Sequence, residues 1–181
     1  MASLVVQAQA LAEDLLADLP RRLAHVRGVA GRADELWAPL SDGDAVAIVS
    51  AAWVHDIGYS ARLAKTGFHP VDGARFLRAE GFDETVVRLV AHHSGAEIEA
   101  EERGLSAELA EFPRPPEYLL DFVTCADMQT GPTGLRVEVQ DRLDEILRRY
   151  QSDDPVYRAI SRSGPSLIAA VDRVTAALAA Q

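Results

Sequence analysis

The sequence contains the stretch Ala51-Ala52-Trp53-Val54-His55-Asp56-Ile57-Gly58-Tyr59, in which an apolar run ends on a histidine and an aspartate. Both side chains favour water unless a partner compensates them. A divalent metal ion compensates both, because imidazole nitrogen and carboxylate oxygen are ligands of iron, zinc and manganese. The pair His55-Asp56 therefore predicts a metal site, provided that the chain supplies further ligands.

This pair stands at the end of a predicted central helix. Residues 45–54 are apolar nearly all round, which is typical of a helix buried on every side. Turn residues at 41–44 precede the helix, and Gly58 follows it and can end it by adopting a positive φ. The pair is therefore expected where the chain leaves the core and a cavity can open.

Histidine is scarce in this chain, and each histidine lies beside an apolar helical pattern or a turn signal. Alone, His25 would more often be a core residue bonded to a carbonyl, and a helix end also favours histidine through its dipole. Asp127 is different, because a charge in its apolar setting is costly unless it is paired. The set as a whole favours a metal site. Its members are His25, His55, Asp56, His69, His92 and Asp127, and His93 stands beside His92.

This order resembles that of the HD superfamily of metal-dependent phosphohydrolases, whose minimal metal set is a histidine, a His-Asp doublet and a distant aspartate. Two further elements resemble those of its two-metal branches, such as HD-type diadenosine tetraphosphate hydrolases and HD-GYP cyclic dinucleotide phosphodiesterases. They are His69-Pro70-Val71-Asp72-Gly73-Ala74, similar to a His-x-x-x-Gly-Ala element, and His92-His93-Ser94-Gly95, similar to a later histidine element. The resemblance covers about residues 20–130.

The resemblance implies a ligand set and a chemistry. Two ions are expected, iron or manganese, with magnesium, nickel, cobalt and zinc as alternatives. Metal-activated water would hydrolyse a small phosphoester, such as a nucleotide or another phosphorylated metabolite, with His55 and Asp56 as the catalytic pair. The implied division is Asp56 as the bridge, with His25, His55 and Asp127 on one ion and His69 and His92 on the other.

Two other functions are compatible with this ligand set. A minority of HD proteins, including myo-inositol oxygenase and the phosphonate-cleaving oxygenases, use it to hold two irons and activate O₂. A non-catalytic metal or nucleotide sensor is the third possibility, and the complete six-ligand set argues against it. Dependence of turnover on O₂ would separate the oxygenase from the hydrolase.

Few cations lie near the motif loops to bind a substrate anion. Many phosphohydrolase relatives carry His-Asp-x-x-Lys, with the lysine assisting phosphate binding, but position 59 is tyrosine here. The extension of HD-GYP proteins is also missing after the histidine pair, which disfavours a cyclic dinucleotide. The predicted substrate-binding residues are Tyr59, Arg62, Lys65, Arg75 and His93.

Length and composition limit the protein class. A chain of 181 residues that is 48% hydrophobic suits one domain, residues 1–181, with a motif-bearing core at about 20–130 and C-terminal helices at 135–181. No signal peptide or membrane-length apolar run is present, so a cytoplasmic protein without a membrane partner is expected. A single cysteine, Cys125, excludes an internal disulfide and a cysteine-based zinc cluster.

The charge limits the partners. A formal net charge of −10 argues against a nucleic-acid polymer, which needs a concentrated basic surface. A small anionic substrate remains compatible, because a few arginines and a metal can bind phosphate within an acidic protein. The oligomeric state is left open.

Helical periodicity predicts an all-α fold, an orthogonal bundle of five core helices of the HD type with extra N- and C-terminal helices. No segment sustains the period-two pattern of a strand, and residues 137–139 are too short to count. The charged segment 96–112 is interpreted as a solvated helix face and loop. Predicted helices cover residues 4–19, 20–36, 45–54, 70–80, 84–91, 118–127, 140–150 and 154–162, and a last helix begins at Pro165.

Overall fold

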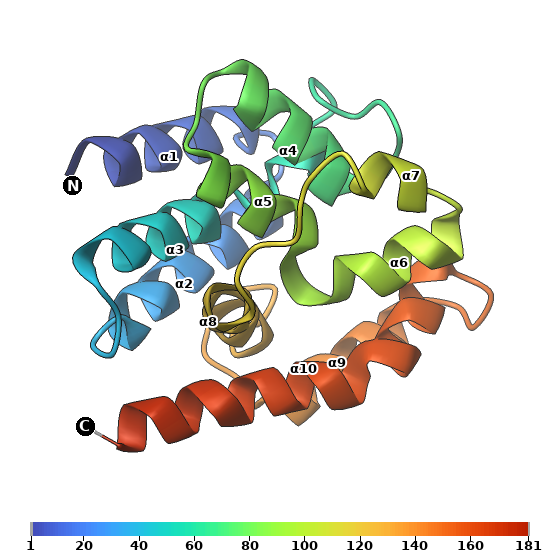
Figure 1. The fold of residues 1–181 in the computed structure, drawn as a ribbon. Coiled ribbons are helices and arrows are strands. Elements are labelled where there is room, and N and C mark those ends of the chain that lie inside the picture. Colours follow the sequence, from blue (N-terminus) through green and yellow to red (C-terminus); the bar gives the residue numbers. More distant parts are fainter. Residues whose placement is uncertain (1, 181) are drawn as a thin grey trace.

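The computed structural model describes residues 2–180 as an assembly of helices (Figure 1). The helices are α1 (Ala2–Leu15), α2 (Pro20–Leu36), α3 (Asp42–Val54), η1 (Ile57–Tyr59), α4 (His69–Ala79), α5 (Glu84–His92), η2 (His93–Gly95), α6 (Ala96–Arg103), α7 (Ser106–Leu109), α8 (Glu117–Met128), α9 (Val139–Arg149) and α10 (Pro155–Ala179). Within residues 2–180 the extended pairing is limited to one isolated bridge between Thr130 and Arg136. The predicted all-α fold is confirmed.

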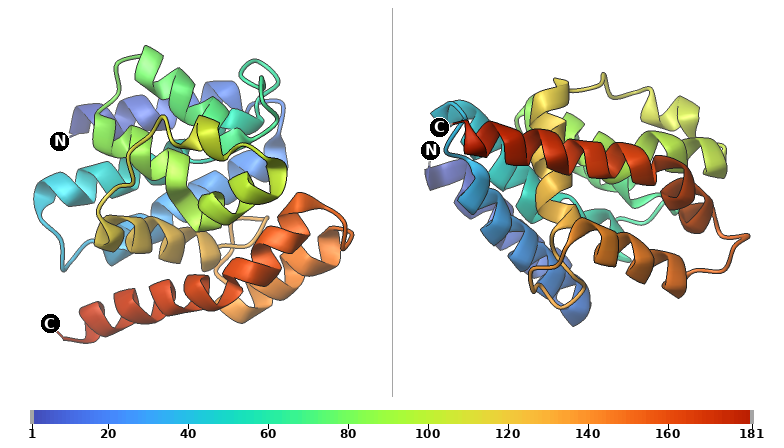
Figure 2. Two further views of the ribbon diagram at one scale, coloured as in Figure 1. Left: turned by 45° about the vertical axis from the view of Figure 1, so that its right-hand side comes forward. Right: turned by 90° about the horizontal axis from the view of Figure 1, so that it is seen from below.

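The helices cross at steep angles. In Figure 1 α8 is seen nearly end-on, whereas α2, α3 and α10 run across the view, and Figure 2 shows α10 lying across α8 from a second direction. Contacts between α10 and α8 agree with this arrangement. Crossings of this kind define an orthogonal bundle, in which side chains from separate helices can meet in the interior.

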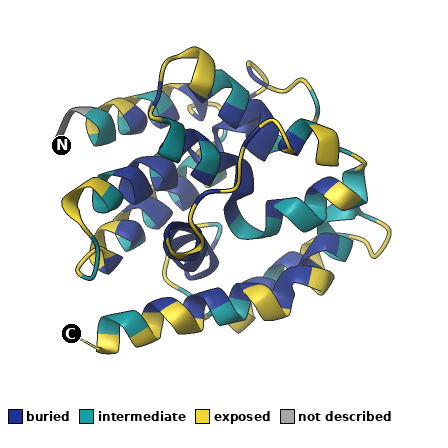
Figure 3. Ribbon diagram, in the orientation of Figure 1, coloured by how far each residue is buried: buried dark blue, intermediate teal, exposed yellow. Residues whose placement is uncertain are grey.

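The central helix α3 is buried as its sequence predicts. It contacts α1, α2, α5 and α8, and its residues 47–52 are all buried (Figure 3). Ser41 begins it by accepting a hydrogen bond at its side chain from the backbone N–H of Asp44, 3.2 Å away. A helix apolar on all sides is stable only when other elements cover it, so α3 anchors the bundle and fixes where the chain leaves the core.

Gly58 has a different role from the one expected. It lies within η1, and its φ is outside the left-handed region. A Cβ at this position would lie 2.0 Å from the carbonyl oxygen of His69. Gly73 faces the same junction, because its Cβ would lie 3.3 Å from the backbone nitrogen of Gly58. The two glycines therefore let α4 start directly against the end of the central helix.

The C-terminal part also differs from the prediction. A helix break before Pro165 was expected, but α10 runs without interruption from Pro155 to Ala179 with Pro165 inside it. Proline disfavours the helical conformation of the preceding residue partly through that residue's Cβ. The preceding residue here is Gly164, which has no Cβ, so this part of the clash is removed and the helix continues.

No helix within residues 2–180 is both long and apolar enough to cross a membrane.

We predict that Gly58→Ala destabilises the protein, because the added Cβ overlaps a backbone oxygen. The expected loss in the free energy of unfolding is about 3 kcal/mol, at the upper end for overpacking. The matched control is Gly31→Ala in α2, where nothing lies within 4 Å of the added Cβ and alanine should stabilise the helix by about 0.5–1 kcal/mol. Equal denaturation midpoints for the two variants would contradict the close approach.

Candidate metal centre

Five separate segments bring the candidate ligands together. His25 lies within α2, His55 and Asp56 follow α3, and Asp127 lies in the last turn of α8. His69 begins α4, and His93 follows α5. Each of these six side chains except that of His69 belongs to a buried residue, and the side chain of His69 is 11% exposed. The packing of these helices therefore brings together ligands that lie far apart in the sequence.

Backbone carbonyl oxygens orient three of the histidines. A carbonyl oxygen only accepts, so each facing Nδ1 carries the proton, and the Nε2 of the neutral ring presents a lone pair. This is the usual arrangement of a metal-binding histidine. The Nδ1–oxygen distances are 3.1 Å for His25 and Gly131, 2.8 Å for His55 and Ala52, and 2.7 Å for His93 and Val90.

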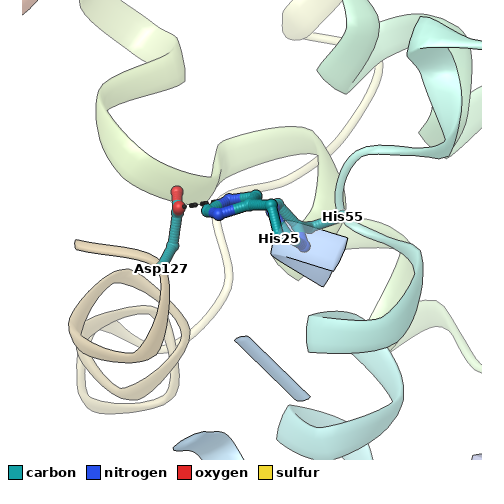
Figure 4. Close-up of side chains that lie close together, drawn as sticks. All are labelled: His25, His55 and Asp127. Carbon is teal, nitrogen blue, oxygen red and sulfur yellow. Dashed lines mark ion pairs between the residues drawn. The ribbon is translucent and has the colours of Figure 1, made fainter. Parts of the chain in front are cut away.

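One group of converging atoms consists of His25, His55 and Asp127. One ligand atom of each lies within 4.8 Å of the others, and the His25 Nε2 atom is 3.0 Å from the Oδ1 atom of Asp127 (Figure 4). Both of those atoms are acceptors in the tautomer set by Gly131. The buried His55 Nε2 and Asp127 Oδ1 atoms have no hydrogen-bond donor. Acceptors that face one another in a buried site need a cation between them, so this group fits a metal ion.

A second group consists of Asp56, His69 and His93. The His69 Nε2 atom lies 3.2 Å from Asp56 Oδ1 and 3.2 Å from His93 Nε2. The His93 Nε2 atom lies 3.9 Å from the same Asp56 oxygen. Two imidazole nitrogens and a carboxylate oxygen thus share a space that suits one metal ion.

The two oxygens of Asp56 face different groups. Oδ1 faces His69 and His93, whereas Oδ2 lies 3.4 Å from the Nε2 atom of His55 and 3.9 Å from that of His25. A carboxylate placed in this way can bind one ion through each oxygen. The donor set contains imidazoles and carboxylates without a thiolate, which fits iron, manganese or zinc.

The electrostatics favour ionised carboxylates and a neutral His93. Burial lowers the pKa of His55, but Asp56 raises it more, so a metal ion at the Nε2 atom of His55 would replace a proton there. Burial raises the pKa of Asp56, but Arg22 and His55 lower it more, so the pKa lies well below its usual value. Burial also raises the pKa of Asp127, and the nearby His25 and His55 again reverse the shift. Burial, with the nearby His55 and His69, lowers the pKa of His93 to about 4. Both carboxylates are therefore ionised at neutral pH, and His93 is neutral.

Arg22 is part of the site although it was not predicted from the sequence. Its guanidinium Nη1 donates to the Oδ2 atom of Asp56 over 2.6 Å, and its Cζ atom lies 4.0 Å from the centroid of the Tyr59 ring. Tyr59 in turn stacks on His69 with ring centroids 4.0 Å apart. Arg22 precedes His25 by three residues, so both lie on one face of α2. That spacing is the signal by which it could have been found.

Ser94 is a second residue that was missed. Its hydroxyl donates to Asp127 Oδ2 over 2.5 Å, which leaves the other oxygen of Asp127 directed at His25. Ser94 is the one residue other than glycine in the described chain with a positive φ, 48°. This left-handed backbone is unfavourable for a residue with a Cβ. Packing around η2 therefore holds Ser94 in a strained conformation that orients a candidate ligand.

The structure places His92 and His93 differently from the expectation. His92 was predicted as a ligand, but its Nε2 atom lies 2.8 Å from the carbonyl oxygen of Phe112, and its Nδ1 atom is 3.4 Å from Glu97. His93, predicted to bind substrate, joins the cluster instead. His55 and His93 both occupy the first position after a helix, at the C-caps of α3 and α5. His92 still belongs to the helix, so its side chain points elsewhere.

The expected substrate cations also lie elsewhere. Arg62 pairs with Asp14 at 2.6 Å, and both side chains are exposed. Arg75 pairs with Glu111, and Lys65 is exposed in the loop before α4. None of the three cations lines the cavity at the cluster, which is about 70 Å³ in volume. The cations that do line this cavity are Arg22, Arg142 and Arg149, together with Tyr59.

Comparison with known proteins agrees with this geometry. The family model of the HD domain matches residues 22–150, and no solved structure matches the chain. The chain therefore belongs to the HD-domain family, whose members bind divalent metals and are generally hydrolases. The match includes every residue of the buried cluster and extends through α9.

We predict that Ser94→Gly separates two effects of this residue, the orientation of Asp127 by its hydroxyl and the strain of its backbone at a positive φ. Loss of the hydroxyl should weaken metal affinity by about 10- to 100-fold, the usual effect of removing a group that orients a ligand. The metal-free protein should lose less stability than Ser94→Ala, because both variants lose the hydrogen bond to Asp127 but only glycine tolerates the positive φ. Ser94→Ala keeps the strained Cβ and should lose the affinity without any gain in stability. Metal titration and thermal unfolding check both effects, and wild-type affinity in both variants would refute this role.

We further predict that His93→Ala removes one of two metal equivalents, whereas His92→Ala retains both. The reason is that only the Nε2 atom of His93 faces Asp56. His92→Ala should lower thermal stability instead, because it leaves the carbonyl of Phe112 without its buried donor. Metal content after equilibration with excess manganese checks this, and loss of metal from the His92 variant alone would restore the assignment made from the sequence.

Proposed function

We propose that the cluster binds two divalent ions and hydrolyses a small phosphoester. The observation that carries the proposal is Asp56, whose two oxygens face two adjoining sets of imidazole nitrogens. One ion would be held by His25, His55 and Asp127, and the other by His69 and His93, with Asp56 shared. When bound, such a pair of ions supplies a hydroxide near neutral pH and stabilises charge on the phosphoryl oxygens.

The residues around the cluster support this chemistry. Arg22 reaches Asp56 from the cavity side and keeps further N–H donors available for a phosphoryl oxygen. Tyr59 stacks on His69 and beneath Arg22, so it limits the positions that both side chains can adopt. In this role Tyr59 orients the cation rather than replacing the lysine of other phosphohydrolases.

The ionised carboxylates serve binding rather than proton transfer. The pKa values of Asp56 and Asp127 lie below their usual range despite burial, so neither side chain carries a proton to donate at neutral pH. These two carboxylates would therefore give no proton to the leaving group, which favours a leaving group that departs without one. Phosphoanhydrides, and phosphate esters with stable leaving groups, meet this requirement best.

We predict that Asp56→Asn reduces phosphate release to background and lowers the metal content, because an amide cannot bridge two cations through two anionic oxygens. The helical circular dichroism should persist. The matched control is Asp121→Asn on α8, which pairs with Arg173 at 2.7 Å outside the cluster and should retain turnover.

The assay measures phosphate release from nucleotides and phosphomonoesters after anaerobic purification and loading with manganese or iron, with and without O₂. Turnover by the Asp56 variant at the wild-type rate would refute the assignment. Turnover that requires O₂ and releases no phosphate would replace the hydrolase with the oxygenase. Tight metal binding without turnover of any substrate would favour the sensor.

A further inference from the structure

A second and larger cavity adjoins the metal centre. Its volume is about 450 Å³, within the usual range for a small-molecule site. It shares Arg22, His25, Tyr59, Arg142 and Arg149 with the small cavity at the cluster. A ligand placed in it therefore lies directly beside the candidate metal ligands.

Arg142 on α9 has an unsatisfied donor in this region. Its side chain is 6% exposed, and its Nε atom is buried without a hydrogen-bond partner. One guanidinium nitrogen, Nη1, donates to Glu145 over 2.6 Å. A buried N–H without an acceptor destabilises the free protein, and an oxygen from a bound anion would remove that cost. The protein thus satisfies the guanidinium only in part, at Nη1, and Arg142 lines the cavity in which a bound anion could supply a further acceptor.

The α9 side of the cavity carries excess positive charge. Arg149 donates to the same carboxylate as Arg142, with Nε 3.0 Å from the Oε1 atom of Glu145. One carboxylate thus serves two guanidinium groups. The acidic side chain that lines this cavity, Asp18, is exposed and is less able to neutralise charge there. Arg22, in contrast, is already paired with Asp56.

We infer that this cavity binds a second anionic group of the substrate, so that the substrate is a phosphoester carrying another phosphate or a carboxylate. The inference rests on the proposed function. Two divalent ions, Arg22, the carboxylates of Asp56 and Asp127 and one hydroxide would together leave two positive charges, which one phosphoryl dianion neutralises. The remaining charge on Arg142 and Arg149 calls for a further anion, and a planar guanidinium suits phosphate and carboxylate alike.

In this inference, substrate selectivity and metal binding depend on different helices. Arg142 and Arg149 lie on α9, which contributes no residue to the six-residue cluster. Their replacement should therefore alter which phosphoesters bind without removing a metal ligand. Arg148, also on α9, is exposed, and its Nε atom donates to the carbonyl oxygen of Asp144 on the same helix. It provides a control of equal charge.

Calorimetry with non-hydrolysable probes tests the inference. The manganese-loaded protein is titrated with methylphosphonate, methylenebisphosphonate and phosphonoacetate, with the same excess of free manganese in cell and syringe. The wild type should bind at least one of the two-anion probes about 10-fold or more tightly than methylphosphonate, as expected for an added charge-assisted contact. The preferred probe distinguishes a second phosphate from a carboxylate.

Arg142→Gln should remove most of this preference, and Arg142→Lys should restore only part of it, because lysine lacks the guanidinium Nε–H. Arg149→Gln, a change at a more exposed side chain, provides an independent variant if Arg142→Gln fails to fold. Arg148→Gln should keep the wild-type preference. A preference that persists in both Arg142→Gln and Arg149→Gln, or is equally lost in Arg148→Gln, overturns the inference.

The two proposals can fail separately. Phosphate release by a protein that shows no preference among the three probes overturns the second anion site and leaves the hydrolase intact. A preference that depends on Arg142 in a protein without hydrolytic activity supports the anion site and overturns the proposed function.

Discussion

A buried carboxylate, Asp56, is the constraint on which the rest of the site depends. Its charge is enclosed by the bundle, where an uncompensated carboxylate would be severely destabilising. Arg22 compensates one oxygen, and imidazole nitrogens from four elements surround both. The arrangement requires α2, the end of α3, the start of α4 and the end of α5 to meet at one point. The close approach at Gly58 is therefore a requirement of the site as well as of the fold.

Helix ends supply much of the orientation. The last carbonyl groups of a helix lack partners within it, and two of them accept from the Nδ1 atoms of His55 and His93 three residues later. Each histidine thereby satisfies a carbonyl and directs its Nε2 atom into the cluster. The same contact explains why the first residue after the helix joins the site, whereas His92, within the helix, bonds to Phe112.

The site and the segment beyond it have separable roles. The candidate ligands come from residues 25–127. Arg142 and Arg149 come from α9, which follows the ligand-bearing helices in the sequence and lines the same cavity. Metal chemistry would then be set by the core helices and the choice of anion by α9. Substitutions on α9 could redirect such a protein to another phosphoester without disturbing the buried histidines.

The sequence alone determined the helical class and a central helix at 45–54, because apolar periodicity is a local signal. Most residues of the cluster followed from buried charge together with the resemblance to HD proteins. The sequence did not separate His92 from His93, since one residue at a helix end changes the side-chain direction and the boundary is set by packing. Arg62, Lys65 and Arg75 were predicted to bind the substrate anion only because they lie near the motifs in the sequence. The spacing of three residues from His25 places Arg22 on the face of α2 that carries a candidate ligand, but its contact with Asp56, 34 residues away, is decided by how the helices pack. Only the tertiary structure could identify Ser94 and Arg142, because the contact of Ser94 spans 33 residues and Arg142 reaches the cavity from another helix.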